Sequence, residues 1–166
     1  PETLYGQVKL DAERALAHLS GPGFAGASLR ATGVYGDNSP GKWDRLIDDY
    51  LRGRPVLPRA GTEVHGRDLG RAVRLMLETE SARISGEIFN VSDIAADTRD
   101  TLSPIRHHAD CPFPLPEAAD KAGLCAMNTD KIRALGWKPG GMPLFEQTMR
   151  QLAEKQTVPR PSSTQV

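Results

Sequence analysis

The chain has 166 residues, of which 39% are hydrophobic and 25% charged, and its formal net charge is zero. This length fits one domain or most of one, with the composition of an ordinary globular protein. The balanced charge gives no attraction to nucleic acid or an anionic membrane, and no apolar run approaches the roughly 20 residues that cross a bilayer. Cys111 and Cys125 are too few for a disulfide framework or a zinc site, so we expect reduced thiols in a cytoplasmic protein.

The first predicted helix places a tyrosine and a lysine one turn apart. Its apolar residues predict one buried stripe, formed by Leu4, Val8, Ala15, Leu16 and Leu19. Tyr5 and Lys9 lie off that stripe and share a face, because they are four residues apart. An ammonium close to a phenol favours the phenolate form, so the pair is a candidate acid/base device. Taken alone, the same spacing also describes an ordinary solvated helix face.

Helices and strands alternate in the following stretch. The glycines and proline of residues 20–23 end the first helix, and residues 24–32 predict a strand. The glycines of residues 33–38 predict a loop. We expect a second helix over residues 39–53, with Ser39 as its cap and Pro40 at its first helical position.

The same alternation continues to residue 91. Residues 55–58 can form only a short edge strand because of their prolines, and residues 59–67 predict a polar loop, extended around Val64. Asp68 is expected to cap the next helix, and residues 87–91 predict another strand. This order is typical of an α/β fold with a parallel sheet.

The remaining sequence predicts mainly helices. We expect helices over residues 98–109, after a cap at Asn128 or Thr129, and from Pro143 onward. Residues 111–116 must be irregular, since their prolines fix the backbone. The tail, residues 156–166, is polar and is expected to be disordered.

Four motifs occur in an order typical of one family. They are Tyr5-Gly6-Gln7-Val8-Lys9, the stretch from Leu29 to Gly36, Val64-His65-Gly66-Arg67-Asp68-Leu69, and Asn128-Thr129-Asp130-Lys131 with Leu135-Gly136-Trp137-Lys138-Pro139. With these motifs the chain resembles the C-terminal portion of an extended short-chain dehydrogenase/reductase of the NAD-dependent epimerase/dehydratase type.

The resemblance implies a fold and a division of the chain. We expect the later part of a Rossmann-like parallel sheet together with a small, mostly helical C-terminal substrate-binding region. Residues 1–91 would hold the Rossmann-like part with interleaved substrate-region elements, and residues 92–155 the substrate-binding region. The family's glycine-rich turn and the Ser or Thr upstream of its tyrosine are absent. We therefore expect a fragment that by itself neither binds NAD tightly nor turns over.

The resemblance also implies roles for individual residues. Tyr5 would be the general acid/base, and Lys9 would assist the phenol and bind the nicotinamide ribose of NAD or NADP. Thr32 falls where family members contact the nicotinamide end of the cofactor. Family members also pair through the helix that carries the tyrosine, which implies a homodimer here.

Two departures concern the substrate. Gly33 stands where sugar-nucleotide epimerases commonly carry a substrate-binding asparagine, and Gly61 where they carry a diphosphate-binding arginine. Arg59 or Arg67 could replace that arginine, because a guanidinium can reach and fork onto phosphate. Both arginines also fit the description of ordinary surface residues in a polar loop.

The expected function is that of an NAD(P)-dependent epimerase/dehydratase-type oxidoreductase on a sugar or nucleotide sugar, with neither nucleic acid nor membrane as a partner. One alternative is a reductase or dehydrogenase acting on a non-nucleotide carbonyl, which the two departures suit. The other is a non-catalytic binding or regulatory protein on the same scaffold, against which the intact Tyr5–Lys9 pair argues.

Overall fold

The computed structural model describes residues 2–156 as an α/β fold with two compact units that interleave along the chain. The first unit combines the chain up to Thr32 with Arg67–Ser92 and Met127–Lys138. The second combines Gly33–Gly66, Asp93–Ala126 and the chain from Pro139. The division at residue 91 expected from the resemblance stays a prediction.

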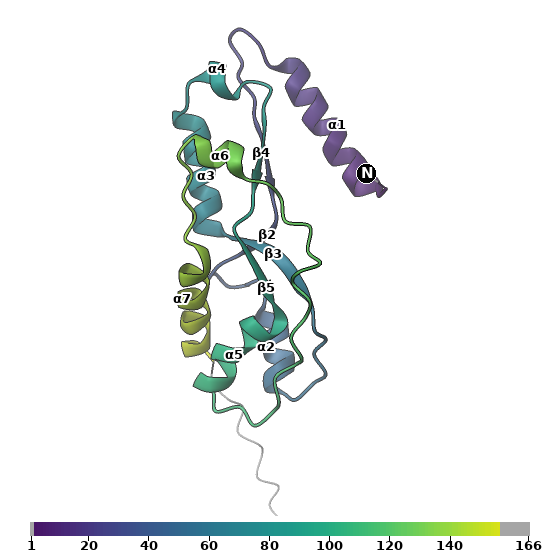
Figure 1. The fold of residues 1–166 in the computed structure, drawn as a ribbon, viewed down its shortest axis with the longest axis vertical. Helices are drawn as coiled ribbons and strands as arrows, with labels where there is room; N and C mark the ends of the chain where they lie inside the picture. The colour runs from purple at the N-terminus through teal and green to yellow at the C-terminus, as the bar shows by residue number, and fades with distance from the viewer. Residues whose placement is uncertain (1, 157–166) are drawn as a thin grey trace, which may run out of the picture. The chain divides into compact units, whose positions relative to one another are not determined.

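A two-stranded parallel sheet of β1 (Ser28–Ala31) and β4 (Ile88–Val91) forms the centre of the first unit (Figure 1). Phe89 and Val91 are buried on the same face of β4, since side chains alternate along a strand. The short helices α4 (Ser81–Ile84) and α6 (Asp130–Ala134) belong to the same unit, and α6 packs on β4 through contacts between Lys131 and its strand.

Helix α3 (Gly66–Glu78) begins three residues earlier than the sequence predicted. Asp68 is therefore inside the first turn and does not cap the helix. Its side chain is fully buried and accepts a hydrogen bond of 3.1 Å from Arg71, while its backbone oxygen accepts one of 2.9 Å from the Trp137 indole. The prediction was wrong because the preceding strand runs directly into the helix, leaving no separate cap position.

Helix α1 (Leu4–Leu19) has the bounds and the end that the sequence predicted, but no buried residue. Thr3 caps it by accepting a hydrogen bond from the Gly6 N–H. The prediction of a buried stripe was wrong: Leu4, Val8 and Leu19 are 58–81% exposed. Helical periodicity identifies the apolar face but not the surface that covers it, and in the described chain α1 makes contacts such as the Glu13–Arg30 ion pair without burying that face.

The second unit contains a three-stranded sheet in the order β2 (Gly33–Tyr35), β3 (Ala60–His65) and β5 (Ile94–Asp97). β2 pairs with β3 in parallel, and β3 pairs with β5 antiparallel. The sequence predicted loops at β2 and β3 and no element at β5. Those predictions were wrong because these strands are short and carry polar residues and glycines whose pairing depends on the tertiary structure.

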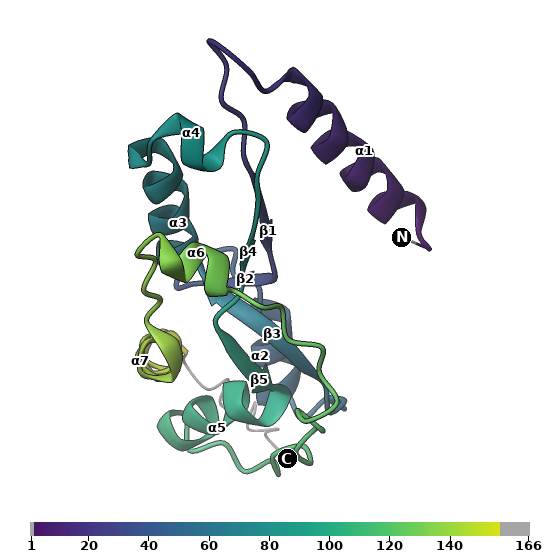
Figure 2. The same cartoon turned by 45° about the horizontal axis from the view of Figure 1, so that its top comes forward.

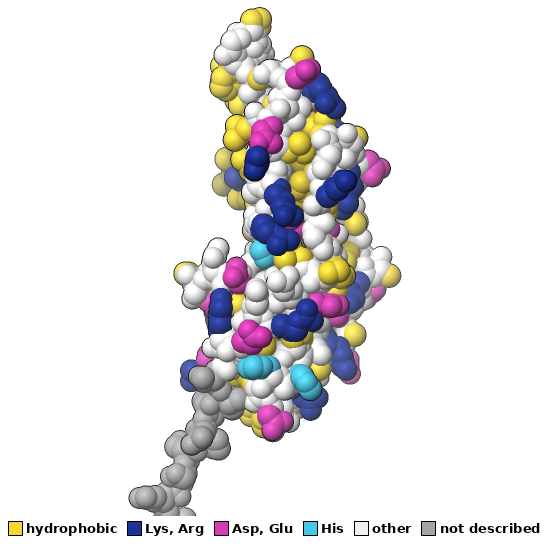
Figure 3. Space-filling model, turned by 90° about the vertical axis from the view of Figure 1, so that its left-hand side faces the viewer, with side chains coloured by type: hydrophobic (Ala, Val, Ile, Leu, Met, Phe, Trp, Pro, Cys, Tyr) yellow, Lys and Arg dark blue, Asp and Glu magenta, His cyan; other side chains and the backbone are white. Residues whose placement is uncertain are grey.

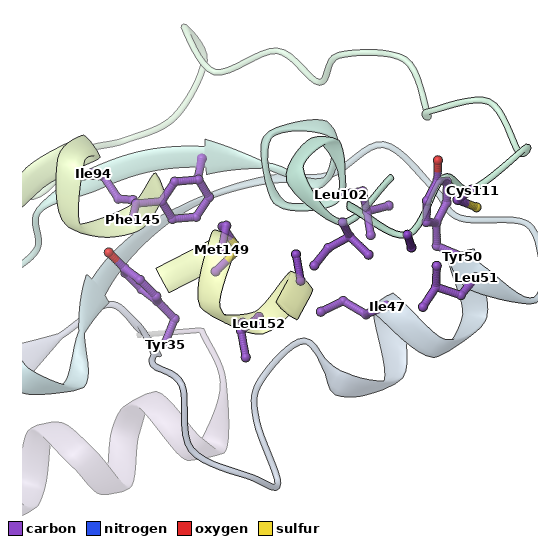
Figure 4. Close-up of a cluster of buried hydrophobic side chains, with 14 residues drawn as sticks. Tyr35, Ile47, Tyr50, Leu51, Ile94, Leu102, Cys111, Phe145, Met149 and Leu152 are labelled. Carbon is purple, nitrogen blue, oxygen red and sulfur yellow. The ribbon is translucent and has the colours of Figure 1, made fainter. Parts of the chain in front are cut away.

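Three helices pack on one another and on this sheet: α2 (Asp44–Leu51), α5 (Thr98–His108) and α7 (Gly141–Glu154). Figure 2 shows α5 and α7 beside each other. Phe145, Met149 and Leu152 of α7 lie against Tyr35 of β2 and Leu102 of α5 in one apolar core (Figure 4). These α7 residues recur at helical spacing and therefore share one buried face of the helix that was predicted from Pro143 onward.

Two local expectations need correction in this unit. The second helix begins at Asp44, not at the Ser39-Pro40 pair, because the Asp44 carboxylate accepts the Gly41 N–H at 2.7 Å and the intervening residues form turns. Residues 55–58 form no strand and remain irregular, since they carry two prolines and β3 begins only at Ala60.

The face in Figure 3 carries basic and acidic side chains among apolar ones, as the zero net charge of the chain would suggest. No helix between residues 2 and 156 combines the length and the apolar character needed to cross a membrane. The tail expected to be disordered lies, from residue 157 on, outside the described residues.

Asp97 caps α5 in a reciprocal arrangement. Its carboxylate accepts the Asp100 N–H at 2.7 Å and the Ala119 N–H at 3.0 Å, while the Asp97 N–H donates to the Asp100 carboxylate. Burial acts to raise the pKa of Asp97, but the two backbone N–H groups and the nearby Lys121 ammonium together hold that pKa below its ordinary value.

We predict that Asp97→Ala lowers the free energy of unfolding by about 1–2 kcal/mol at neutral pH, through loss of the cap. Because the folded-state pKa is depressed, the charge contributes stability above the unfolded pKa of about 3.9 and loses it as pH falls through the folded value. Asp97→Asn keeps a capping oxygen and is expected to weaken this acid dependence. Urea unfolding at pH 7 and pH 3 measures both effects, and an unchanged pH dependence in Asp97→Asn would contradict the assignment.

Candidate functional site

A cleft of about 810 Å³ opens in the second unit. It lies among the start of β2, the helix α2 with the residues before it, the irregular residues 55–57, β3, and the junction of β5 with α5. Gly33 and Arg59, both predicted as substrate-binding residues, line this cleft. Its size is in the range of pockets that hold small organic ligands.

The part of the cleft beside Gly33 is occupied by an ion pair. Lys42 donates to the carboxylate of Glu63, which is 8% exposed. A Cβ atom built on Gly33 would collide with both charged groups and lie 2.8 Å from Glu63 Cδ. Glycine at this position therefore makes room for the pair, and a side chain such as asparagine would have to displace it.

Arg59 stands at the exposed rim of the cleft. Its backbone is fixed to α5, because the Arg59 N–H donates to Thr98 Oγ1 at 3.1 Å and the Thr98 N–H donates to the Arg59 carbonyl at 2.9 Å. Its guanidinium has no hydrogen-bond or ion-pair partner among residues 2–156. The side chain is thus free to contact a ligand.

Trp43 forms an apolar wall of the cleft and connects it to the core. Its ring lies 5.3 Å from that of Tyr35 and 5.9 Å from that of Phe145, measured between centroids. His65 packs edge-on against Tyr35, with ring centroids 5.0 Å apart, as expected for a packing residue. This aromatic cluster holds the wall rigidly in place.

Tyr5 and Lys9 share one face of α1, as their spacing predicted. Lys9 Nζ lies 5.5 Å from the centroid of the Tyr5 ring, and the tyrosine is 74% exposed. The ammonium thus lies over the ring of the phenol, and neither residue lines the cleft described above. Their catalytic and cofactor-binding roles stay predictions.

Thr32 lies at the carboxyl ends of the parallel strands β1 and β4. Its N–H donates to the Val91 carbonyl at 3.2 Å, and its hydroxyl donates to Ser92 Oγ at 3.3 Å. Ligands of open α/β sheets bind outside the carboxyl ends of strands, so the position suits the predicted contact with the nicotinamide end of a cofactor.

Arg67, the other candidate for binding phosphate, lies in the first turn of α3 and does not line the cleft. Its Nε is 3.7 Å from the buried carboxylate of Asp68. A guanidinium held near a carboxylate inside its own unit is less available to a ligand than that of Arg59.

Sequence reasoning missed Lys42 and Glu63. Lys42 lies in a stretch that was predicted to be helical but precedes α2, and Glu63 lies in a stretch that was predicted to be a loop but forms part of β3. A signal was present: Val64 follows Glu63 in an extended stretch, and assigning residues 33–35 and 60–65 as paired parallel strands would have placed Glu63 opposite Gly33.

No cluster of His, Cys, Asp or Glu side chains suited to a metal ion occurs within residues 2–156. His107 and His108 lie in the last turn of α5.

Comparisons with family models and with curated proteins give no match. Solved structures do match. A UDP-glucose 4-epimerase from Thermotoga maritima with UDP-glucose is 21% identical, with a TM-score of 0.67, over 93% of this chain and 53% of the epimerase. RMD from Pseudomonas aeruginosa complexed with NADPH is 17% identical, with a TM-score of 0.68, over 93% of this chain and 56% of RMD. MoeE5 in complex with UDP-glucuronic acid and NAD is 21% identical, with a TM-score of 0.66, over 93% of this chain and 55% of MoeE5.

The chain therefore spans about half the length of these structures. At this level of identity the likeness shows the fold: the chain has the α/β fold of part of these enzymes. The resemblance based on the sequence motifs is thus confirmed for the fold.

We predict that Lys42→Met lowers the free energy of unfolding by about 1–3 kcal/mol, because it leaves the nearly buried Glu63 carboxylate without its charged donor. Adding Glu63→Leu to this variant should recover part of the loss, since replacing both partners removes the unpaired charge. Urea unfolding followed by tryptophan fluorescence measures Lys42→Met, Glu63→Leu and the double variant. Additive losses would show that the two side chains do not interact.

Proposed function

We propose that the protein is an NAD(P)-dependent oxidoreductase of the epimerase/dehydratase type acting on a sugar or nucleotide sugar. The premise is that the solved structures that share this fold are nucleotide-sugar and NADPH-binding enzymes, of which the chain spans about half. The observation that carries the proposal is the position of Tyr5 and Lys9, which share one exposed face of the helix at the start of this fold.

In this proposal the chain's own residues move one proton. The Tyr5 phenol gives a proton to a substrate carbonyl oxygen and becomes a phenolate, and in the opposite direction the phenolate takes a proton from a substrate hydroxyl. The Lys9 ammonium stabilises the resulting phenolate by its charge and donates to a ribose hydroxyl of the cofactor. Thr32 binds the nicotinamide end at the strand termini. When bound, NAD or NADP supplies the hydride chemistry, and the protein positions the reacting groups.

A reductase or dehydrogenase on a non-nucleotide carbonyl is the second candidate function. It is favoured by the ion pair beside Gly33, which fills the room that a substrate-binding asparagine would need. In either function, Arg59 is a cation at the rim of the cleft that can reach an anionic group of the substrate.

We predict that Tyr5→Phe lowers kcat of the intact protein about 10²–10⁴-fold, the usual contribution of a general acid/base, and leaves the Kd of the cofactor nearly unchanged. Lys9→Met should lower kcat and also weaken cofactor binding. Cofactor absorbance during turnover of sugars and nucleotide sugars measures kcat, and calorimetry measures Kd.

Tyr50→Phe is the matched control for this experiment. The Tyr50 phenol is in the core and donates to the Phe113 carbonyl at 2.9 Å, and burial, followed by the nearby Cys111 thiol, raises its pKa to about 12. Its loss should affect stability but not kcat. Equal turnover by the native protein and Tyr5→Phe would refute the proposed mechanism.

We also propose a cytoplasmic homodimer that pairs through α1, whose apolar side chains are exposed. Val8→Lys would then shift the dimer to monomer, because a charge would enter the apolar interface. Leu77→Lys, at a leucine on α3 that is 82% exposed, is the control and should leave the dimer intact. Sedimentation velocity distinguishes the two species, and an unchanged sedimentation coefficient for Val8→Lys would exclude pairing through this face.

A further inference from the structure

Two glycines flank the carboxylate of Glu63 in the cleft. One is Gly33, where a Cβ atom would collide with the Lys42–Glu63 ion pair. The other is Gly61, two residues before Glu63 on β3, where a Cβ atom would lie 3.4 Å from Glu63 Oε1. Residues 61 and 63 share a face of the strand, because side chains alternate along it. Because neither glycine has a side chain, both positions leave room for the Glu63 carboxylate and its ion pair.

The pair remains accessible from the cleft although Glu63 is nearly buried. One third of the Lys42 side chain is exposed, compared with one tenth of the Glu63 side chain. The Lys42 ammonium also lies 5.5 Å from the centroid of the Trp43 ring. A ligand beside Gly33 would therefore meet an ammonium, a carboxylate and an aromatic wall.

Charges around the cleft cancel. Three cations and three carboxylates line it: Lys42, Arg45, Arg59, Asp49, Glu63 and Asp97. Asp97 is engaged by backbone N–H groups, and Asp49 pairs with Arg54 at 2.7 Å. Glu63 is the carboxylate that lies beside the two glycines, where Lys42 is its partner.

This arrangement favours hydroxyl groups over a diphosphate. An anion that approached Lys42 would also approach Glu63, and like charges in a partly desolvated site repel each other. A hydroxyl group, in contrast, can accept a hydrogen bond from an ammonium and donate one to a carboxylate. Two adjacent hydroxyls of a sugar therefore complement the pair without disturbing it.

We propose that Lys42 and Glu63 are substrate-binding residues that select a neutral, hydroxyl-rich ligand, such as a sugar ring, at the Gly33 end of the cleft. Lys42 donates to one hydroxyl oxygen, Glu63 accepts from a neighbouring hydroxyl, and Trp43 contacts the apolar face of the ring. This inference rests on the proposed function only in taking the cleft as the substrate site.

The test is a titration of the ¹⁵N-labelled full chain, separately with methyl glucoside and with inorganic pyrophosphate. Methyl glucoside is expected to shift the amide signals of Lys42, Glu63 and the Trp43 indole, whereas pyrophosphate at the same concentration leaves them unchanged. Glu63→Gln and Lys42→Gln should each raise the Kd for the glucoside about tenfold, the effect of one lost charged hydrogen bond.

Arg45→Gln is the matched control, because this cation lines the same cleft with a side chain that is 95% exposed and lies outside the ion pair. It should leave the Kd for the glucoside unchanged. A second variant, Gly61→Arg, adds a guanidinium next to Glu63 without removing either partner and is expected to introduce pyrophosphate binding.

The inference is overturned if pyrophosphate shifts the Glu63 signals of the native chain, if the glucoside shifts none of them at saturation, or if Arg45→Gln weakens binding as much as Lys42→Gln. Failure of the proposed function has a different signature, since turnover that does not depend on Tyr5 would leave these binding results unaffected.

Discussion

The parallel register of β2 against β3 determines the chemistry of the cleft. Tyr35 pairs with His65, and Gly33 consequently pairs with Glu63. Tyr35 is 2% exposed and packs between Trp43 and Phe145, so its side chain must face the core. A slip of one residue would turn Tyr35 outward and move Glu63 away from the glycine. Burial of one aromatic ring thus positions a carboxylate in the cleft two residues away.

The buried carboxylate in turn fixes the segment before α2. A nearly buried charge needs a partner, because its desolvation is otherwise uncompensated. Lys42 supplies that partner from outside the sheet, and its neighbour Trp43 joins the aromatic cluster. The ion pair and the aromatic cluster therefore hold the same short segment from two sides, which gives the cleft a defined wall although that segment has no regular secondary structure.

The sequence predicted those elements whose signal is local. Helices α1, α5 and α7 have caps, glycine ends or strong apolar spacing, and their predicted bounds agree closely with the structure. The strands β2, β3 and β5 could not be predicted because each is three to six residues long and is stabilised by pairing with residues distant in the chain. In α1 the apolar spacing was correctly identified, but exposure depends on neighbouring surfaces, which spacing does not specify.

In the candidate site, too, local sequence predicted single residues but not the contacts between them. Gly33 and Gly61 were identified as two separate departures from the pattern of nucleotide-sugar epimerases, yet both positions border the Glu63 carboxylate. An arginine at position 61 would lie on the same strand face as Glu63 and compete with Lys42 for it. An asparagine at position 33 would need the volume that the pair occupies. The two departures are therefore one physical change, in which Glu63 takes Lys42 as its partner, and a fold shared at about 20% identity does not by itself determine which ligand this cleft prefers.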